Sequence, residues 1–504
     1  MSADLGPCGA HRSLLSVDGT SKRDAAVPMK KHIALVSAVG CALVLTVTAC
    51  GAGQQPSGVS QQPSGTLRVR SCTVDNLSAR CGTLFVFEDR LTGKGRTIPI
   101  NFVVLPALGR HRSPDPIVDF AGGPGGSAIS DIPLVSAELE GLIPSRDLVF
   151  IDQRGTGGSN GLSCPSLPPT LASRAKLRAS IESCLASLRG KAALQFYTSK
   201  MAAEDVAQVL TALHYRKVNL FGASYGATEA QVFQRLFPAR VRTMTLLSGS
   251  FLGIPMVERF PEASQQALDE LFARCASDPV CRADFPHLAA DWAELRAAKW
   301  VNDATLGDEV HEVLMSADTT AYLPLAIRSL LATQGHRAAV DAVARQMADV
   351  GLTGGPSGQA VIGYPIGCAE PWARVTAAGI TDPASYYYQD GVLSAQWWQY
   401  VCTLIPTSRA ASDYGPPRVS DTPVLMINGT ADPQDPPANM AGAQQIWPNS
   451  REVAEPWQSH SVDINAWMQC GATLVRAFVE TANVKGLDTG CLAQVRLPPF
   501  AVSW

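Results

Sequence analysis

Residues 218–226 read Val-Asn-Leu-Phe-Gly-Ala-Ser-Tyr-Gly, and this stretch decides the fold. The apolar run Val218–Phe221 leads directly into Gly-Ala-Ser-Tyr-Gly at 222–226, and the helix-like stretch Thr228–Phe237 follows. Gly-x-Ser-x-Gly alone occurs by chance in glycine-rich chains. A nucleophile elbow, however, requires a strand before the serine and a helix after it, with glycines where neighbouring backbone passes close by. Because both flanks are present, the stretch predicts that Ser224 is a nucleophile.

Further short apolar runs lie on both sides of the elbow and alternate with helix-like stretches such as Ala202–Leu213. Short, continuous apolar runs are typical of buried parallel strands. Alternation of strand and helix indicates an α/β fold, a mostly parallel sheet with helices on both faces. The predicted strands are Leu84–Phe87, Ile98–Leu105, Ile117–Phe120, Leu148–Asp152, Val218–Phe221, Met244–Leu247, Val424–Ile427 and Glu452–Ala454.

The alternation stops after Ser250 and is replaced by helical periodicity up to about Pro416. The helix-like stretches are Ala263–Arg274, His287–Lys299, Tyr322–Leu331 and Ala338–Asp349. The strand pattern resumes at Pro423. We therefore predict a catalytic α/β domain formed by residues 67–250 and 416–504, with a helical lid, residues 251–415, inserted between the sixth and seventh predicted strands. An independent helical domain is the alternative.

The first 50 residues predict export. Met29-Lys30-Lys31 is a basic start, Ile33–Ala49 is apolar, and Cys50 follows small residues. This order is typical of a signal peptide, with Met29 as the expected start, and the final residues resemble a bacterial lipobox in which Cys50 is acylated. A membrane span is the alternative, but the run is shorter than the ~20 residues that a span needs; signal cleavage without a lipid is a second. Residues 51–66, rich in Gly, Gln, Pro and Ser, are predicted to form a flexible tether.

Composition bounds the partners and the compartment. A formal net charge of −3 argues against nucleic-acid binding. Thirteen cysteines are unusual for a cytosolic protein. Apart from Cys8, Cys41 and Cys50, they fall into five successive pairs of near neighbours, as cysteines in local disulfides do. Metal binding is the alternative, but no Cys-x-x-Cys or Cys/His cluster occurs, so we expect neither metal nor cofactor. The ten are Cys72, Cys81, Cys164, Cys184, Cys275, Cys281, Cys368, Cys402, Cys470 and Cys491.

A glycine-rich loop follows the predicted strand Ile117–Phe120, with Gly-Gly-Pro-Gly-Gly at 122–126. Acyl transfer needs backbone N–H groups aimed at the developing oxyanion, and a loop at this place supplies one donor while the residue after the nucleophile, Tyr225, supplies the other. A phosphate loop or an ordinary turn is the alternative, and Gly-Lys-Ser/Thr is missing. The segment Asp-Gln-Arg-Gly at 152–155 is interpreted as a capped turn without a catalytic role.

The base and its orienting acid should follow the nucleophile in the order acid, then histidine. Of the eight histidines, only His460 follows the strand Val424–Ile427 that should carry the acid. Asp432 lies just past the carboxyl edge of that strand, where active sites of such sheets lie. Asp435 is the competing acid. A surface histidine is the alternative for His460.

Taken in order, Gly-Gly-Pro-Gly, Asp-Gln-Arg-Gly and Gly-Ala-Ser-Tyr-Gly resemble the proline iminopeptidase branch of the α/β-hydrolases. The cysteine pairs, the long lid and the tail with Cys470 and Cys491 resemble the secreted tripeptidyl aminopeptidase group, from about Cys72 onward. The resemblance implies a triad of Ser224, Asp432 and His460, with the first oxyanion donor near Gly123. Two departures are Ala121, where proline iminopeptidases usually carry His, and the serines 459 and 461, which flank His460 in place of glycines.

The sequence and this resemblance together predict an exported serine exopeptidase, on the outer face of the cell membrane or secreted, that acts on peptides with a free N-terminus. Glu370, in the predicted lid, is the candidate acid for the substrate ammonium; an exposed lid carboxylate is the alternative. An esterase or lipase with the same triad, or a catalytically dead surface lipoprotein, are the rival interpretations. Dehalogenases and epoxide hydrolases are disfavoured because their nucleophile is Asp.

Overall fold

The computed structural model describes the chain from residue 63 onward with several internal gaps. The described residues are 63–164, 174–252, 254, 256–352, 361–370, 386–388, 397–407, 418–461 and 463–504. The predicted signal region, Cys50 and nearly all of the predicted tether lie outside these ranges. Within them, no helix has both the length and the apolar character that crossing a bilayer requires.

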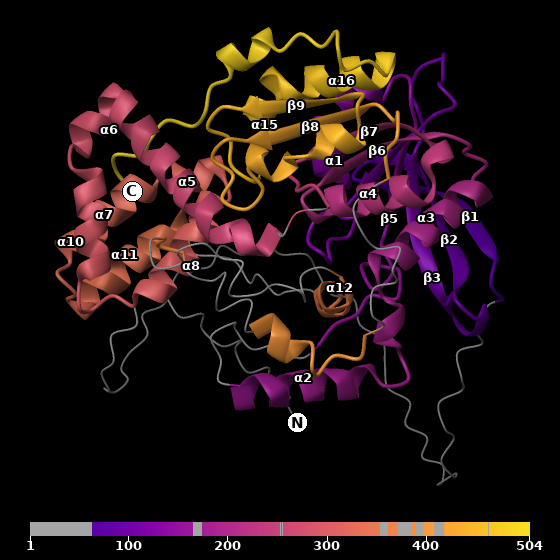
Figure 1. Ribbon diagram of the computed structural model, residues 1–504, viewed down its shortest axis with the longest axis horizontal. Coiled ribbons are helices and arrows are strands. Elements are labelled where there is room, and N and C mark those ends of the chain that lie inside the picture. The colour runs from indigo at the N-terminus through magenta and orange to yellow at the C-terminus, as the bar shows by residue number, and fades with distance from the viewer. Residues whose placement is uncertain are drawn as a thin grey trace, which may run out of the picture.

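A nine-stranded sheet, in the order β1-β2-β3-β5-β4-β6-β7-β8-β9, is the centre of the described structure (Figure 1). β1, β2, β3 and β5 pair antiparallel, whereas β5, β4, β6, β7, β8 and β9 run parallel. The strands are β1 (Leu67–Val74), β2 (Leu77–Asp89), β3 (Lys94–Leu105), β4 (Ile117–Phe120), β5 (Leu148–Ile151), β6 (Val218–Ala223), β7 (Val241–Leu247), β8 (Val424–Gly429) and β9 (Ser450–Glu455). All eight predicted strands are present.

The edge strand β1 was not predicted from the sequence. It pairs only with β2, and its first five residues are exposed. Arg68 and Arg70 alternate with its apolar residues, so no continuous apolar run marks it. An edge strand exposed on both faces carries little of the burial pattern by which strands are recognised.

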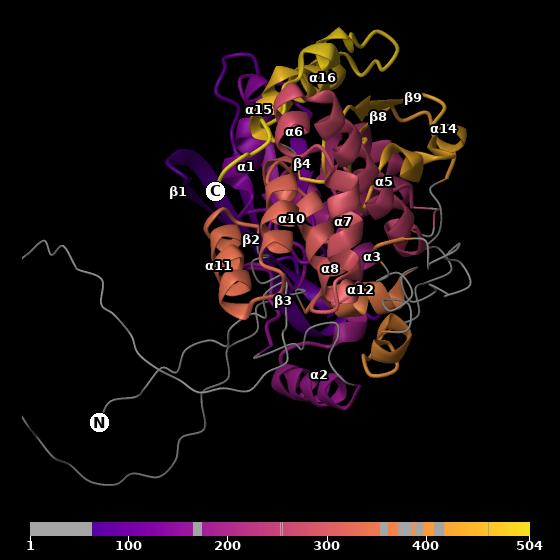
Figure 2. The same cartoon turned by 90° about the vertical axis from the view of Figure 1, so that its left-hand side faces the viewer.

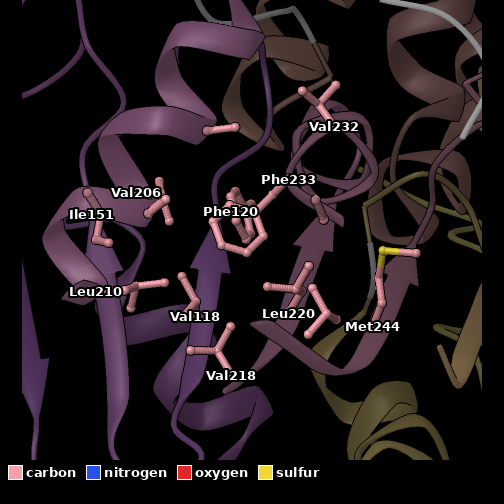
Figure 3. Close-up of a cluster of buried hydrophobic side chains, with 14 of the residues drawn as sticks. Val118, Phe120, Ile151, Val206, Leu210, Val218, Leu220, Val232, Phe233 and Met244 are labelled. Atoms are coloured by element: carbon pink, nitrogen blue, oxygen red, sulfur yellow. The ribbon is translucent and has the colours of Figure 1, made fainter. Parts of the chain in front are cut away.

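Helices cover both faces of the sheet. Alternate residues of each strand point to opposite faces, so Val118 and Leu220 join one core while Ile117 and Phe221 join the other. The first core includes residues of α3 (Ser199–Ala212) and α4 (Tyr225–Leu236), and Figure 3 shows Phe233 of α4 beside Phe120. The second includes residues of α1 (Ile132–Glu138), α15 (Ile464–Gln469) and α16 (Gly471–Thr481). The central strands β4 to β8 are therefore buried on both faces.

A group of seven helices lies in the chain between β7 and β8 and has its own hydrophobic core. They are α5 (Met256–Ser277), α6 (Pro279–Asp284), α7 (Leu288–Ala297), α8 (Asp303–Leu314), α9 (Ala317–Thr320), α10 (Leu323–Ala332) and α11 (Arg337–Asp349). We call residues 256–349 the helical block; it lies beside the sheet in Figure 1 and in front of the sheet in Figure 2. Further α-helices are α2 (Arg174–Leu188), α12 (Gly363–Ala369) and α14 (Ala443–Ile446), and residues 397–401 are also helical.

The C-terminal tail returns to the helical block after α16. Phe500 is part of the core of the block. The Ala501 N–H donates to the Ala321 carbonyl at 3.1 Å, and the Trp504 indole donates to Ser329 Oγ at 3.1 Å. The C-terminal tail is thus a third connection between the helical block and the α/β part. The other two are the chain segments that lead into and out of the block.

Five disulfides join successive cysteines, as the near-neighbour spacing predicted. They are Cys72–Cys81, Cys164–Cys184, Cys275–Cys281, Cys368–Cys402 and Cys470–Cys491. In the described part of the chain, no group of three or more His, Cys, Asp and Glu side chains could hold a metal ion.

Candidate active site

Ser224 occupies the sharp turn between β6 and α4. Its backbone has φ 55° and ψ −126°, a conformation that a non-glycine residue rarely adopts. A Cβ on Gly226 would lie 1.8 Å from the carbonyl oxygen of Phe120 at the end of β4, so only glycine fits at this position. Close contact with β4 thus holds the strained turn that presents the Ser224 hydroxyl beyond the carboxyl end of the sheet.

The structure brings Ser224, His460 and Asp432 together from three separate parts of the chain. The His460 Nε2 lies 2.9 Å from Ser224 Oγ, and its Nδ1 lies 3.0 Å from Asp432 Oδ2. Asp432 is fully buried after β8, and His460 follows β9. A nucleophile bonded to a base that is itself oriented by an acid is the geometry of acyl-transfer triads. The prediction that Asp432 and His460 lie beside Ser224 therefore matches the geometry.

The Asp432 carboxylate is oriented by its own loop. Its Oδ1 accepts the N–H groups of Gln434 at 2.9 Å and of Asp435 at 2.8 Å. Hydrogen bonds to the charged form of a carboxylate stabilise that form. The competing acid, Asp435, has its Oδ2 at 3.7 Å from His460 Nδ1, which is farther away than Asp432.

The charge of this loop acts on the base. Burial lowers the pKa of His460, but the adjacent Asp432 charge and hydrogen bond outweigh burial, and together with Asp435 and Glu312 they raise it to about 9. A general base must be neutral to accept a proton. His460 therefore becomes available as a proton acceptor only as the pH rises toward 9.

The helical block contacts both loops that carry the acid and the base. The Ser461 N–H, next to His460, donates to the carbonyl of Met315 at 2.7 Å. The Ser264 hydroxyl of α5 donates to the carbonyl of Pro433 at 3.1 Å and also lies 2.6 Å from His311 Nδ1. Burial, first, and the nearby His460 lower the pKa of His311 to about 4, so this second histidine is neutral at physiological pH.

The glycine-rich loop lies against the nucleophile. A Cβ on Gly122 would be 3.5 Å from Ser224 Cβ, and Gly123 has φ +125°, which disfavours any side chain. Tyr225 is the first residue of α4, so its N–H is among those without an acceptor inside the helix. The glycine-rich loop and Tyr225 therefore both lie next to Ser224, the region in which oxyanion donors would have to lie.

Asp152, at the end of β5, fixes the segment after the glycines. Its Oδ1 accepts the Ser127 hydroxyl at 2.7 Å and the Ile129 N–H at 3.2 Å, while its Oδ2 accepts the Gly158 N–H at 2.9 Å. One carboxylate thus ties the glycine-rich loop to the next turn. The interpretation of residues 152–155 as no more than a capped turn was incomplete, because the sequence does not show which distant N–H groups a buried Asp accepts.

The two residues after Asp152 support the other side of the nucleophile. Gln153 Nε2 donates to the Tyr225 hydroxyl at 2.9 Å, and Ser199 Oγ lies 2.6 Å from the same hydroxyl. The fully buried Arg154 makes a bidentate ion pair with Asp205 at 2.7 and 2.9 Å. These contacts hold the Tyr225 side chain, and with it the first turn of α4, in one position.

Glu370 follows α12 and is buried, so the alternative of an exposed lid carboxylate is wrong. Only 3% of its surface is exposed, and its Oε1 accepts the N–H of Ser199 at 2.9 Å. Burial, then the charge of Glu370, raises the pKa of both Tyr225 and Glu229, the latter to about 8. The charge of Glu370 is therefore close enough to Tyr225, the residue after Ser224, to affect its ionisation.

A family model described as the alpha/beta hydrolase fold matches residues 115–462. The chain belongs to the α/β-hydrolase fold family. Tripeptidyl aminopeptidases of Streptomyces coelicolor and Streptomyces lividans are similar to it, with 31% identity over 144 residues. That alignment covers 25% of this chain and 26% of each relative, so the chain matches about a quarter of the length of these relatives.

Solved α/β-hydrolase structures are also similar to this chain. An esterase from Thermogutta terrifontis has 15% identity and a TM-score of 0.36, covering 80% of this chain and 99% of its own. Proline iminopeptidase of Mycobacterium smegmatis has 14% identity and a TM-score of 0.37, covering 79% and 97% respectively.

Proposed function

We propose that this chain is a serine exopeptidase that releases short peptides or amino acids from the N-terminus of its substrates. The observation that carries the proposal is the continuous set of contacts from Ser224 Oγ to His460 Nε2 at 2.9 Å and from His460 Nδ1 to Asp432 at 3.0 Å. A binding protein has no need for a serine in a strained turn beside a partly buried histidine and a buried carboxylate.

The reaction is acyl transfer. His460 Nε2 takes the proton of Ser224 as the hydroxyl oxygen attacks the scissile carbonyl, and N–H groups near Tyr225 and Gly123 stabilise the oxyanion. His460 then gives that proton to the leaving amine, and the C–N bond breaks to leave an ester on Ser224. Water, deprotonated by His460, attacks the ester, and the acid product leaves as Ser224 recovers its proton.

Two observations support a peptide substrate with a free N-terminus. The curated relatives are tripeptidyl aminopeptidases. Glu370 is a buried carboxylate that acts electrostatically on Tyr225, beside the nucleophile. In this proposal the Glu370 carboxylate attracts the substrate ammonium, and the distance between the two sites limits how many residues are removed per cleavage.

The proposal includes export to the outer face of the membrane. It rests on the signal-like segment that ends at Cys50 and on the five disulfides, which form in oxidising compartments. Acylation of Cys50 would anchor the protein in the membrane. Globomycin treatment or Cys50→Ala should therefore change the fraction of the protein that is recovered with the membrane.

The decisive experiment compares tripeptide-aminomethylcoumarin substrates with free and acetylated N-termini, using wild type and Ser224→Ala. We expect turnover of the free form, little turnover of the blocked form, and none by the variant. Strong ester hydrolysis without peptide turnover would instead assign an esterase or lipase. A wild type that fluorophosphonate fails to label would identify a catalytically dead surface protein.

A further inference from the structure

Two buried carboxylates, not one, face the same nitrogen of His460. Asp432 Oδ2 lies 3.0 Å from Nδ1, and Asp435 Oδ2 lies 3.7 Å from the same atom. Asp435 is 1% exposed. A triad requires only one acid, so the mechanism above leaves the second carboxylate without a task.

The Asp435 side chain is held in place by contacts from the ends of two strands. The Ser250 hydroxyl, after β7, donates to its Oδ1, and Gln434 Nε2 donates to its Oδ2 at 3.1 Å. Asn428, near the end of β8, donates its side-chain amide to the Asp435 carbonyl at 2.7 Å. These fixed partners hold the carboxylate beside His460 rather than letting it turn to solvent.

We propose that Asp435 is a positioning residue whose carboxylate stabilises the His460 imidazolium together with Asp432 and sets the pH at which the base becomes neutral. This inference rests on the proposed acyl transfer through Ser224. It assigns no contact between Asp435 and the substrate.

The charged groups around Asp435 determine the direction of the effect. Burial raises the pKa of Asp435, the charge of His460 lowers it, and the charge of Asp432 raises it. The resulting pKa is about 6. From α8, the charge of Glu312 also raises the pKa of His460, while His460 lowers the pKa of the neighbouring His311. Above pH 6 the ionised Asp435 favours the imidazolium, so His460 loses its proton only at higher pH. Removing that charge should lower the pKa of His460.

The test is the pH dependence of fluorophosphonate labelling of Ser224, which reports the ionisation of His460 without depending on a peptide substrate. For Asp435→Asn, we expect the rising limb of the labelling rate to move to lower pH by about one unit. Labelling should then be faster than wild type near pH 7, and several-fold slower above pH 9, where a less basic His460 is a weaker base. The half-exposed carboxylate of Asp341 on α11 supplies the control, and Asp341→Asn should match wild type.

A merely structural role would lower the rate at every pH and leave the limb where it is, and that result would overturn the inference. Asp435→Ser is the second variant, because it removes the same charge with a smaller side chain and should move the limb in the same direction by a similar amount. If thermal unfolding shows that Asp435→Asn does not fold, an unmoved limb in Asp435→Ser overturns the inference. Absence of labelling in wild type would instead refute the proposed function.

Discussion

The proposed nucleophile and the proposed acid–base pair are supported by different parts of the molecule. Ser224 is held by the sheet itself, through the contact of Gly226 with β4 and the glycine-rich loop that Asp152 anchors. Asp432 and His460 lie on loops that residues of the helical block also contact, at the Pro433 carbonyl and the Ser461 N–H.

This difference separates two ways of losing activity. A change in the sheet-supported half disturbs the serine and the oxyanion donors and leaves the base in place. A change in the helical block displaces the acid and the base while the elbow stays intact. The chemistry still requires both halves, because residues of a triad act as a unit.

The largest effect is expected from removing Ser224, which the sheet supports, or His460, whose loop the helical block contacts. Ser224→Ala and His460→Ala should each lower kcat by about 10⁶, and the double variant should be no slower than either alone, because either loss ends nucleophilic catalysis. Kinetics of a free-N-terminus tripeptide-coumarin substrate measure this. Losses that multiply in the double variant would show that the two groups act independently.

A smaller effect is expected from the sheet-supported half. Asp152→Ala frees the segment after the glycine-rich loop, and we expect kcat to fall by about 10²-fold with little change in KM, as for loss of one oxyanion donor. Asp89, the last residue of β2, also accepts backbone N–H groups through its carboxylate and is the matched control. If kcat fell equally in Asp89→Ala and Asp152→Ala, the hydrogen bonds of Asp152 would have no specific role at the site.

The smallest expected effect comes from the helical block. Ser264→Ala removes one hydrogen bond to the loop of Asp432, worth about 1 kcal/mol, and should lower the rate of fluorophosphonate labelling about fivefold. Ser277→Ala, on the same helix α5, alters a hydroxyl that bonds only within its own turn and should leave the rate unchanged. A Ser264→Ala protein that labels at the wild-type rate would show that the sheet alone supports the acid.

The same division explains how far the sequence could predict the site. Ser224 is recognisable because its strand, its glycines and its helix are contiguous, and Asp432 and His460 follow from chain order and from the ends of strands. The support of the acid–base pair could not be predicted, because Ser264 and Pro433 lie 169 residues apart in sequence.

Buried polar residues were the hardest to interpret. Asp152 looked like a cap, and Glu370 could equally have been exposed, since a carboxylate carries no sequence signal that tells which backbone N–H it will accept. The fold was easier: continuous apolar runs predicted eight of the nine strands of the described sheet, and only the exposed edge strand β1 was missed.

The tail that carries Phe500 has a consequence for the order of assembly during synthesis. The helical block is made long before this tail, yet the tail completes its core with Phe500 and the Ala501 contact to Ala321. Domains generally fold as units as the chain emerges, but this block can close only after both halves of the sheet have been translated. Until then the part of its core that Phe500 covers stays open to solvent.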